Sequence, residues 1–193
     1  MKLAKITLFV GAFALTAALI SCGGSKPVAK DDSMGKDIVI PCSDEEFHSD
    51  QQFFRGTGAE SSSALDMAKS KALTSAKANL AGNITTTIKK VTDRYRNERQ
   101  VGENSELEAK YEDMTREVVS QELNNISQVC TKTRQMKDGK YTVYIALEIK
   151  KDELLNKVTE KISKDDKLKL DYDKMKFENV FNEEMNKLAG EQK

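Results

Sequence analysis

The fold of this chain is decided by residues 126–149, ISQVCTKTRQMKDGKYTVYIALEI. In the second half of this stretch every other residue is apolar, and a period of two indicates a β-strand with one buried face. The apolar residues are Tyr141, Val143, Ile145, Leu147 and Ile149. The sequence Lys-Asp-Gly at 137–139 separates the halves, and Asp-Gly pairs favour tight turns. We therefore expect an antiparallel hairpin with strands over 126–136 and 140–149.

Two registers of this hairpin compete. A two-residue Asp-Gly turn would place Arg134 opposite Val143. A three-residue loop, with its glycine in the left-handed conformation, would place Thr133 there and Val129 opposite Leu147. We prefer the second register because it keeps charged side chains off the apolar face.

A long helical pattern precedes the hairpin. Small and apolar residues recur at threes and fours and form one stripe. These residues are Leu65, Ala68, Ala72, Ala76, Leu80, Ile84, Ile88, Val91 and Tyr95. Alanines fill the first half of the stripe, so the neighbouring surface must come close there. Ser63 and Asp66 fit a capping box at the helix start, and Gly82 is a position where the helix could bend.

The remaining elements follow the same reasoning. Residues 52–59, QFFRGTGA, predict a first strand. Further helical patterns occupy residues 105–123, 152–162 and 171–188. The last pattern has an apolar stripe that must lie on the domain, on another subunit or on a membrane face. The residues of that stripe are Phe177, Phe181, Met185 and Leu188.

These elements predict the α+β class: a three-stranded antiparallel sheet with a long Ala-rich helix packed on one face, plus a second helix and C-terminal helices. We expect four parts along the chain. They are a lipoprotein signal peptide at 1–21, a flexible tether at 22–37, the α+β domain at 38–163 and a C-terminal helix at 164–193.

The N-terminus indicates export. An uncharged apolar run from Ile6 to Ser21 follows two lysines, and it is typical of a signal peptide rather than a membrane span. The run ends in ALISC, residues 18–22, which resembles a bacterial lipobox. In such lipoproteins the cysteine is lipidated, and two or three acyl chains, at roughly 0.8 kcal/mol per buried methylene, hold a protein almost permanently. We expect Cys22 to be the lipidation site; the alternative is an ordinary cleaved signal.

The charge balance bears on partners. The chain has 31 basic and 31 acidic residues, and removal of Lys2 and Lys5 with the signal leaves a slight acidic excess. Proteins that bind nucleic acid generally show a basic excess. We therefore expect no nucleic-acid partner.

Two further cysteines remain, Cys42 and Cys130. In an exported protein an even pair predicts a disulfide. Such a bridge would stabilise the fold by roughly 4 to 5 kcal/mol, because it closes a long loop. The preferred hairpin register places Cys130 on the opposite face of the sheet from the apolar residues. On that opposite face residues 38–42, IVIPC, would cover it. Two buried free thiols are the alternative.

Reaction chemistry is sparse. The one histidine, His48, lies in an acidic loop with Asp44, Glu45 and Asp50. A zinc site needs several nitrogen or sulfur donors, so one imidazole does not predict a metal. A catalytic serine would also have to use His48, and the chain has no Gly-x-Ser-x-Gly elbow. We expect no metal, no cofactor and no enzymatic activity.

Three other patterns favour structural roles. Residues 55–58, RGTG, lack the Gly-Lys-Ser ending of a phosphate loop, so these glycines serve the strand. The serines at 61–63 suit helix capping better than nucleophilic attack. Glu183 and Glu184 are expected to face solvent.

Several stretches together resemble the bacterial lipoprotein-twenty family. They are FRGTGA at 54–59, DMAKSKALTSAKANLAGNITTTIKKVTDRY at 66–95 and DGKYTVYIALEIKKDELL at 138–155. The resemblance covers about residues 52–155 and extends to the lipobox. It implies a strand–helix–hairpin domain, an outer-membrane lipid anchor and no catalytic residues. Cys22 is the functional residue that it implies.

The first hypothesis is a lipid-anchored lipoprotein of the cell envelope with a structural or protein-interaction role. It would lie at the outer membrane, on the periplasmic side or at the cell surface. Its partners would be the membrane, through the N-terminal lipid, and either further copies of itself or another envelope protein. The alternative is an envelope carrier of a small ligand, bound on the sheet face or in a gap under the Ala-rich helix.

Overall fold

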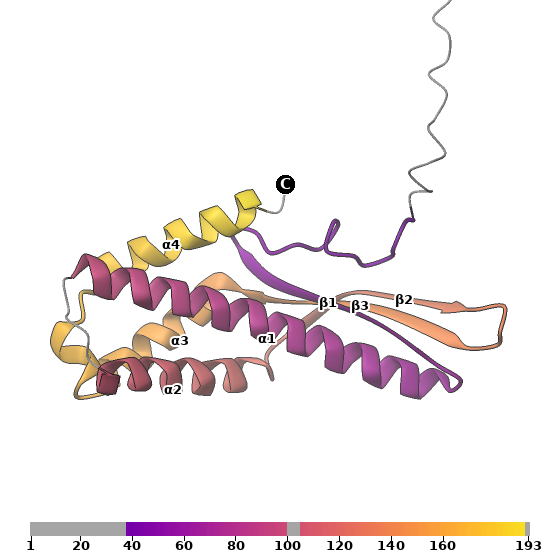
Figure 1. Cartoon of the computed structure of the whole chain (residues 1–193), viewed down its shortest axis with the longest axis horizontal. Coiled ribbons are helices and arrows are strands. Elements are labelled where there is room, and N and C mark those ends of the chain that lie inside the picture. The colour runs from indigo at the N-terminus through magenta and orange to yellow at the C-terminus, as the bar shows by residue number, and fades with distance from the viewer. Residues whose placement is uncertain (1–37, 100–104, 192–193) are drawn as a thin grey trace, which may run out of the picture. The chain divides into compact units, whose positions relative to one another are not determined.

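The computed structural model describes residues 38–99 and 105–191 (Figure 1). The helices and strands follow in the order β1 (Phe53–Ser62), α1 (Leu65–Glu98), α2 (Ser105–Glu122), β2 (Ser127–Gln135), β3 (Tyr141–Lys150), α3 (Lys151–Lys164), the 3-10 helix η2 (Leu168–Asp171) and α4 (Lys174–Glu191). All of them belong to one unit, residues 39–193. The order and the sheet confirm the predicted α+β class.

The three strands form one antiparallel sheet in the order β1-β3-β2, so the expected hairpin lies beside β1. The glycine of the hairpin turn has a φ of 82°, and Thr133 pairs with Val143, as the three-residue loop requires. The expected pairing of Val129 with Leu147 is wrong, because Gln128 takes that place. The pairing shifts by one residue at Val129, where a bulge puts two residues of β2 opposite one of β3.

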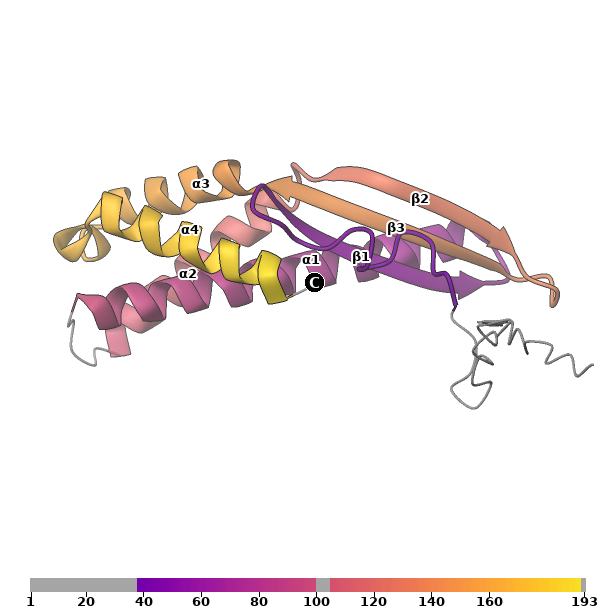
Figure 2. The same cartoon turned by 90° about the horizontal axis from the view of Figure 1, so that it is seen from above.

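Helix α1 packs on one face of the sheet, along β1 and β3 (Figure 2). The stripe was expected to begin at Leu65, but that residue is 42% exposed at the start of the helix. The next four residues of the stripe are fully buried, and they are Ala68, Ala72, Ala76 and Leu80. The two backbones come close because β1 carries Gly56 and Gly58. A Cβ atom at either glycine would lie 2.4 Å from a backbone atom of α1. Small residues on both elements thus allow direct backbone contact.

The start of α1 differs from the expected capping box. The helix begins at Leu65 with Ala64 as its N-cap, and no side chain caps it. Because β1 extends as far as Ser62, Ser63 belongs to the short connection. The Ser62 hydroxyl accepts a hydrogen bond from the amide of Ala64 at 3.4 Å instead. The helix then continues through Gly82 without interruption.

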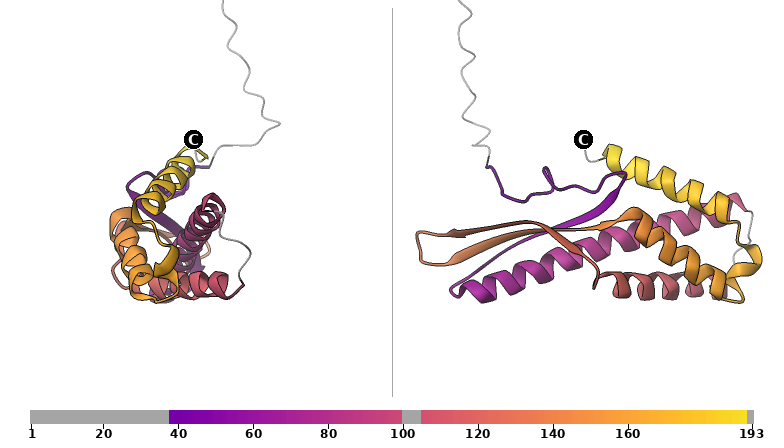
Figure 3. Two further views of the ribbon diagram at one scale, coloured as in Figure 1. Left: turned by 90° about the vertical axis from the view of Figure 1, so that its left-hand side faces the viewer. Right: turned by 180° about the vertical axis from the view of Figure 1, so that it is seen from behind.

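The second half of α1 packs with the other helices. It contacts α2 and α4, and α3 contacts both of these (Figure 3, left). Tyr95 of α1 meets Phe177 of α4 edge to face, with ring centroids 5.4 Å apart. Phe54 of β1 meets Phe181 in the same way, at 6.4 Å. Of the three surfaces considered for the stripe of the last helix, the domain itself covers it.

An ion-pair cluster also joins α1 to α4. Arg94 donates hydrogen bonds to Glu183 and to Glu184, the latter at 3.0 Å. The expectation that both carboxylates face solvent is wrong for Glu184, whose side chain is 11% exposed. Burial raises the pKa of Glu184, but hydrogen bonds from Lys187 and Arg94 outweigh it, so the pKa is lowered. Packing of the apolar stripe of α4 on the domain therefore places the two carboxylates next to Arg94 of α1.

Candidate functional site

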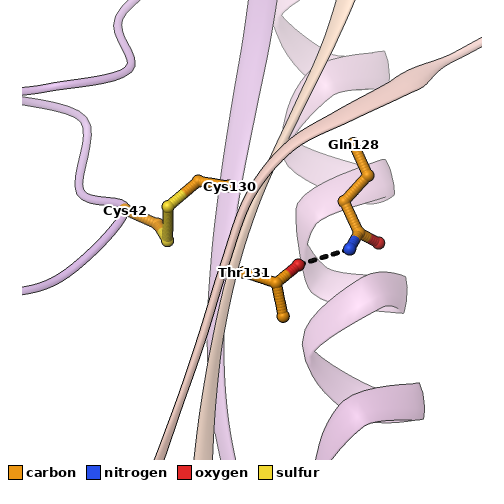
Figure 4. Close-up of a disulfide and its surroundings, with 4 residues drawn as sticks. All are labelled: Cys42, Gln128, Cys130 and Thr131. Atoms are coloured by element: carbon orange, nitrogen blue, oxygen red, sulfur yellow. Dashed lines mark hydrogen bonds between the residues drawn. A yellow bond between two sulfur atoms is a disulfide. The ribbon is translucent and has the colours of Figure 1, made fainter.

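Residues 39–52, which we call the strap, run along the sheet face opposite α1 (Figures 1 and 3). Cys42 of the strap and Cys130 of β2 lie at disulfide distance, with sulfur atoms 2.10 Å and Cα atoms 5.7 Å apart. In Figure 4 Cys130 points to the strap, whereas Gln128 and Thr131 point to the side of α1. The structure thus brings together the cysteine pair that the sequence predicts, on the face where it was expected.

Polar side chains fasten the rest of the strap to β1. The Asp44 carboxylate accepts a hydrogen bond from the Thr57 hydroxyl at 2.7 Å. The hydroxyl of Ser49, which is buried, accepts from the Arg55 amide at 2.9 Å and donates to the Arg55 carbonyl at 3.3 Å. Ser49 therefore satisfies both backbone groups of a strand residue, as a paired strand would.

Arg55 is the centre of these contacts. Its guanidinium donates to Glu148 of β3 at 2.9 Å, to Asp50 at 2.6 Å and to the His48 carbonyl at 2.8 Å. Burial disfavours the Asp50 charge, but hydrogen bonds from backbone amides and from Arg55 outweigh it, so the pKa of Asp50 is lowered. Its lowered pKa makes Asp50 a poor general base at neutral pH. The arrangement ties the strap to two strands.

A cleft of about 620 Å³ opens beside Arg55, between the strap and α1. His48 lines it, and the Nδ1 atom of its ring is buried without a hydrogen-bond partner. The two polar side chains that follow it in sequence, Ser49 and Asp50, are hydrogen-bonded to Arg55 instead. Nucleophilic catalysis needs a nucleophile bonded to a base, and His48 makes no such bond here.

The other motifs that the sequence raised can be placed in the described residues. No group of three or more His, Cys, Asp or Glu side chains among them is placed to hold a metal ion. Of the serine triplet, Ser61 lies in β1, where its hydroxyl is hydrogen-bonded to that of Thr142 at 2.7 Å. The glycines of residues 55–58 lie in the strand against α1, which agrees with the structural role predicted for them.

Sequence reasoning missed the side chains that protect the outer edge of β1. Asn79 and Asn83 of α1 donate hydrogen bonds to the carbonyls of Thr57 and Arg55, at 2.8 and 2.9 Å. Four helical residues rise about 6 Å, which is close to the span of two strand residues. Asparagines at i and i+4 beside an alanine stripe were the available signal.

A separate groove of about 470 Å³ lies between α1 and α2. Tyr111 and Val119 of α2 line it with apolar surface, together with Leu123, which directly follows the helix. At its rim Lys89 of α1 reaches Glu112 of α2 at 3.7 Å. This volume lies within the range of small-molecule pockets. By contrast, the gap expected under the Ala-rich part of α1 is closed by its contact with Gly56 and Gly58 of β1.

The predicted lipidation site, Cys22, lies outside the described residues, together with the signal peptide and tether. In the part of the chain that is described, no helix combines the length and apolar character needed to cross a membrane. Comparison with protein-family models, with curated proteins and with solved structures found no match to this chain.

Proposed function

We propose that this chain is a lipid-anchored protein of the bacterial cell envelope that acts through contact with other proteins, without catalysis. The observation that carries the proposal is the Cys42–Cys130 pair at disulfide distance. Disulfides persist in oxidising compartments outside the cytosol. An exported protein whose residues 18–22 read ALISC has in Cys22 a natural point for an acyl anchor.

The non-catalytic part of the proposal is supported by how the polar groups are used. Arg55, Asp50 and Glu148 bind one another rather than facing a substrate. Ser49 and Ser61 are engaged with the sheet. In the proposed setting the anchor holds the domain at the outer membrane, on the periplasmic side or at the cell surface, as the resemblance to the lipoprotein-twenty family implies.

Labelling in cells tests the anchor. Cells grown with an alkyne analogue of palmitate should label the wild-type protein, and Cys22→Ala should abolish the label. Cys42→Ala is the matched control, because it removes a cysteine that lies outside the lipobox and should keep the label. Label that persists in Cys22→Ala, or a mature protein that begins downstream of Cys22, would refute the anchor.

Crosslinking and protease treatment of intact cells test the remaining parts. A short amine-reactive crosslinker should yield discrete larger species that contain this protein and disappear after membrane solubilisation. Protease added outside the cells should digest the domain only if it faces the surface. A protein that stays uncrosslinked over a wide range of expression levels would contradict a role in protein contact.

The α1–α2 groove favours a second candidate, a carrier of a small apolar ligand. Native mass spectrometry of the purified protein should then show an added mass that is lost in Ser120→Trp, where the bulky ring fills the rim of the groove. A protein that carries no added mass, and takes up none from a lipid extract, would dismiss this candidate.

A further inference from the structure

The sheet has two edges, and the chain treats them differently. At the outer edge of β1, side chains of Ser49, Asn79 and Asn83 bond the backbone groups that face away from β3. Strand β2 is the outer strand on the other side of the sheet (Figure 2). At its free edge no backbone group is bonded by any described side chain or strand, and nearly all residues of β2 are exposed. A row of unpaired backbone N–H and C=O groups of this kind can pair with another strand.

The alternation of an antiparallel ladder identifies the open groups. The Met136 amide donates to the Lys140 carbonyl at 2.8 Å, so the pairs that bond across to β3 include Met136 and every second residue before it. The residues between them direct their N–H and C=O groups outward. These are Thr131, Thr133 and Gln135. They offer the hydrogen bonds of an added strand.

The side chains of β2 decide which strand fits. Lys132 and Arg134 follow Cys130 at every second position of the strand, so all three lie on one face of the sheet. Neither cation has a carboxylate partner among the described residues. The Arg134 guanidinium lies over the ring of Tyr144, 6.0 Å from its centroid. The strand from 127 to 135 contains no acidic residue. Its exposed surface is therefore positively charged on one face.

A second copy of β2 fits this edge poorly. Two antiparallel copies centred on Thr133 would place Lys132 against Arg134, and two copies centred on Lys132 would place that residue against itself. Like charges directly opposite one another destabilise a strand pair, whereas opposite charges stabilise it. The same geometry favours a strand that carries carboxylates at alternate positions.

We propose that the outer edge of β2 binds an extended acidic segment of another protein by strand addition. Thr131, Thr133 and Gln135 provide the backbone hydrogen bonds, while Lys132 and Arg134 select carboxylates two residues apart on the incoming strand. This inference deepens the proposed role in protein contact and rests on it. It names the partner surface and its chemistry, and it does not depend on the lipid.

The test uses two synthetic peptides with the purified protein. One has the sequence Thr-Glu-Val-Glu-Thr-Glu-Val, and the other has lysine in place of each glutamate. Isothermal calorimetry should show that the acidic peptide binds about tenfold or more tightly than the basic one, since two charge pairs change sign. The double variant Lys132→Glu/Arg134→Glu should reverse the order of the two peptides.

A proline variant tests strand addition itself. Thr133→Pro removes an outward N–H and keeps the ladder to β3, so the domain should stay folded and lose binding of the acidic peptide at least tenfold. Thr133→Val keeps the N–H and should bind like wild type. Unchanged binding in folded Thr133→Pro, or equal binding of both peptides, would overturn the proposal.

Two further outcomes separate the possible failures. If the wild-type protein dimerises in sedimentation and Thr133→Pro abolishes the dimer, the occupant is a second copy and the acidic-partner proposal is overturned. If Cys22 carries lipid and cells yield crosslinks, yet neither peptide binds, the β2 inference fails while the proposed function stands. If no crosslinks form and no label is found, the proposed function fails as well.

Discussion

Replacing Gly58 by alanine adds one methyl group where β1 and α1 come closest. The new Cβ would lie 2.4 Å from the carbonyl oxygen of Ala72 and 2.5 Å from the amide nitrogen of Ala76. Both are backbone atoms of a helix, so no side chain can rotate out of the way. The helix must therefore move outward, and its alanine stripe must lose contact with the sheet.

The size of the effect follows from that displacement. Normal contact between such atoms is about 3.5 Å, so α1 must shift by about 1 Å, and a gap of that size forfeits up to about half of the dispersion energy of each contact. Overpacking of this kind costs about 1–3 kcal/mol. Because the clash is with backbone, we expect about 3 kcal/mol for Gly58→Ala. In a domain of this size that lowers Tm by about 6–12 °C.

Gly82, which lies in α1 itself, provides a matched control for the change at Gly58 of β1. It is exposed, and a Cβ there meets nothing within 4 Å. Gly82→Ala should therefore stabilise the protein by about 0.5–1 kcal/mol, because alanine favours a helix interior over glycine. The same replacement of glycine by alanine should thus destabilise the protein at position 58 and stabilise it at position 82.

Thermal and urea unfolding, followed by circular dichroism at 222 nm, measure both variants. Conformational preference alone would predict that Gly58→Ala stabilises the protein, since alanine is also more favourable than glycine within a strand. The predicted loss of stability therefore comes from the clash with α1. A Gly58→Ala variant as stable as the wild type would show that β1 and α1 do not touch through their backbones. The packing of the whole Ala-rich stripe would then need another explanation.

Three further predictions concern the strap, the protected edge and a charged helix end. Asn79→Asp keeps the shape of the side chain but removes its donor, so it should cost about 1 kcal/mol in urea unfolding. Removing the bond between Cys42 and Cys130, by changing both to alanine, should cost roughly 4 to 5 kcal/mol in the chain-entropy model. The Lys110 ammonium, with backbone amides, lowers the pKa of Asp165 from 3.8 to about 2. Its folded pKa is below the unfolded value, so the stability that it adds is present above pH 3.8 and is lost as pH falls towards 2.

Each of these has its own control. Asn97→Asp makes the same change at a position on α1 that bonds no strand carbonyl, and equal losses at both asparagines would refute edge protection. Dithiothreitol should lower the Tm of the wild type and leave the double cysteine variant unchanged; the opposite pattern would contradict the bridge. Asp165→Asn should flatten the stability profile between pH 4 and pH 2 relative to the wild type, and parallel profiles would contradict the assigned pKa.

The hairpin could be predicted because two independent signals agree there. The alternation from Tyr141 to Ile149 predicts which face of β3 packs against α1, and the position of the charges on β2 selects the turn length. The alternation does not predict the burial of Thr142 and Ala146 on the opposite face. The bulge at Val129 has no such signal, since an extra residue is visible only when both strands are paired. The capping box failed for a related reason: pairing of Ser62 with Tyr141 extends β1 up to the helix.

The site was only partly accessible from sequence. An even pair of cysteines predicts a bridge without knowledge of the fold. The Arg55 cluster joins groups from the strap and from β3, with Glu148 lying 93 residues away. No local pattern links such residues. The role of Asn83 could have been found only after β1 was known to lie alongside α1, because that role consists of a hydrogen bond to the Arg55 carbonyl.

The bond between Cys42 and Cys130 also determines how the molecule carries mechanical load. Tension applied between the chain before Cys42 and the C-terminus passes through the sulfur atoms straight into β2. Residues 43–129, with β1, α1 and α2, then lie outside the stretched path. When the protein is pulled from its two ends, this region can unfold and lengthen the chain only after a reductant has broken the disulfide bond.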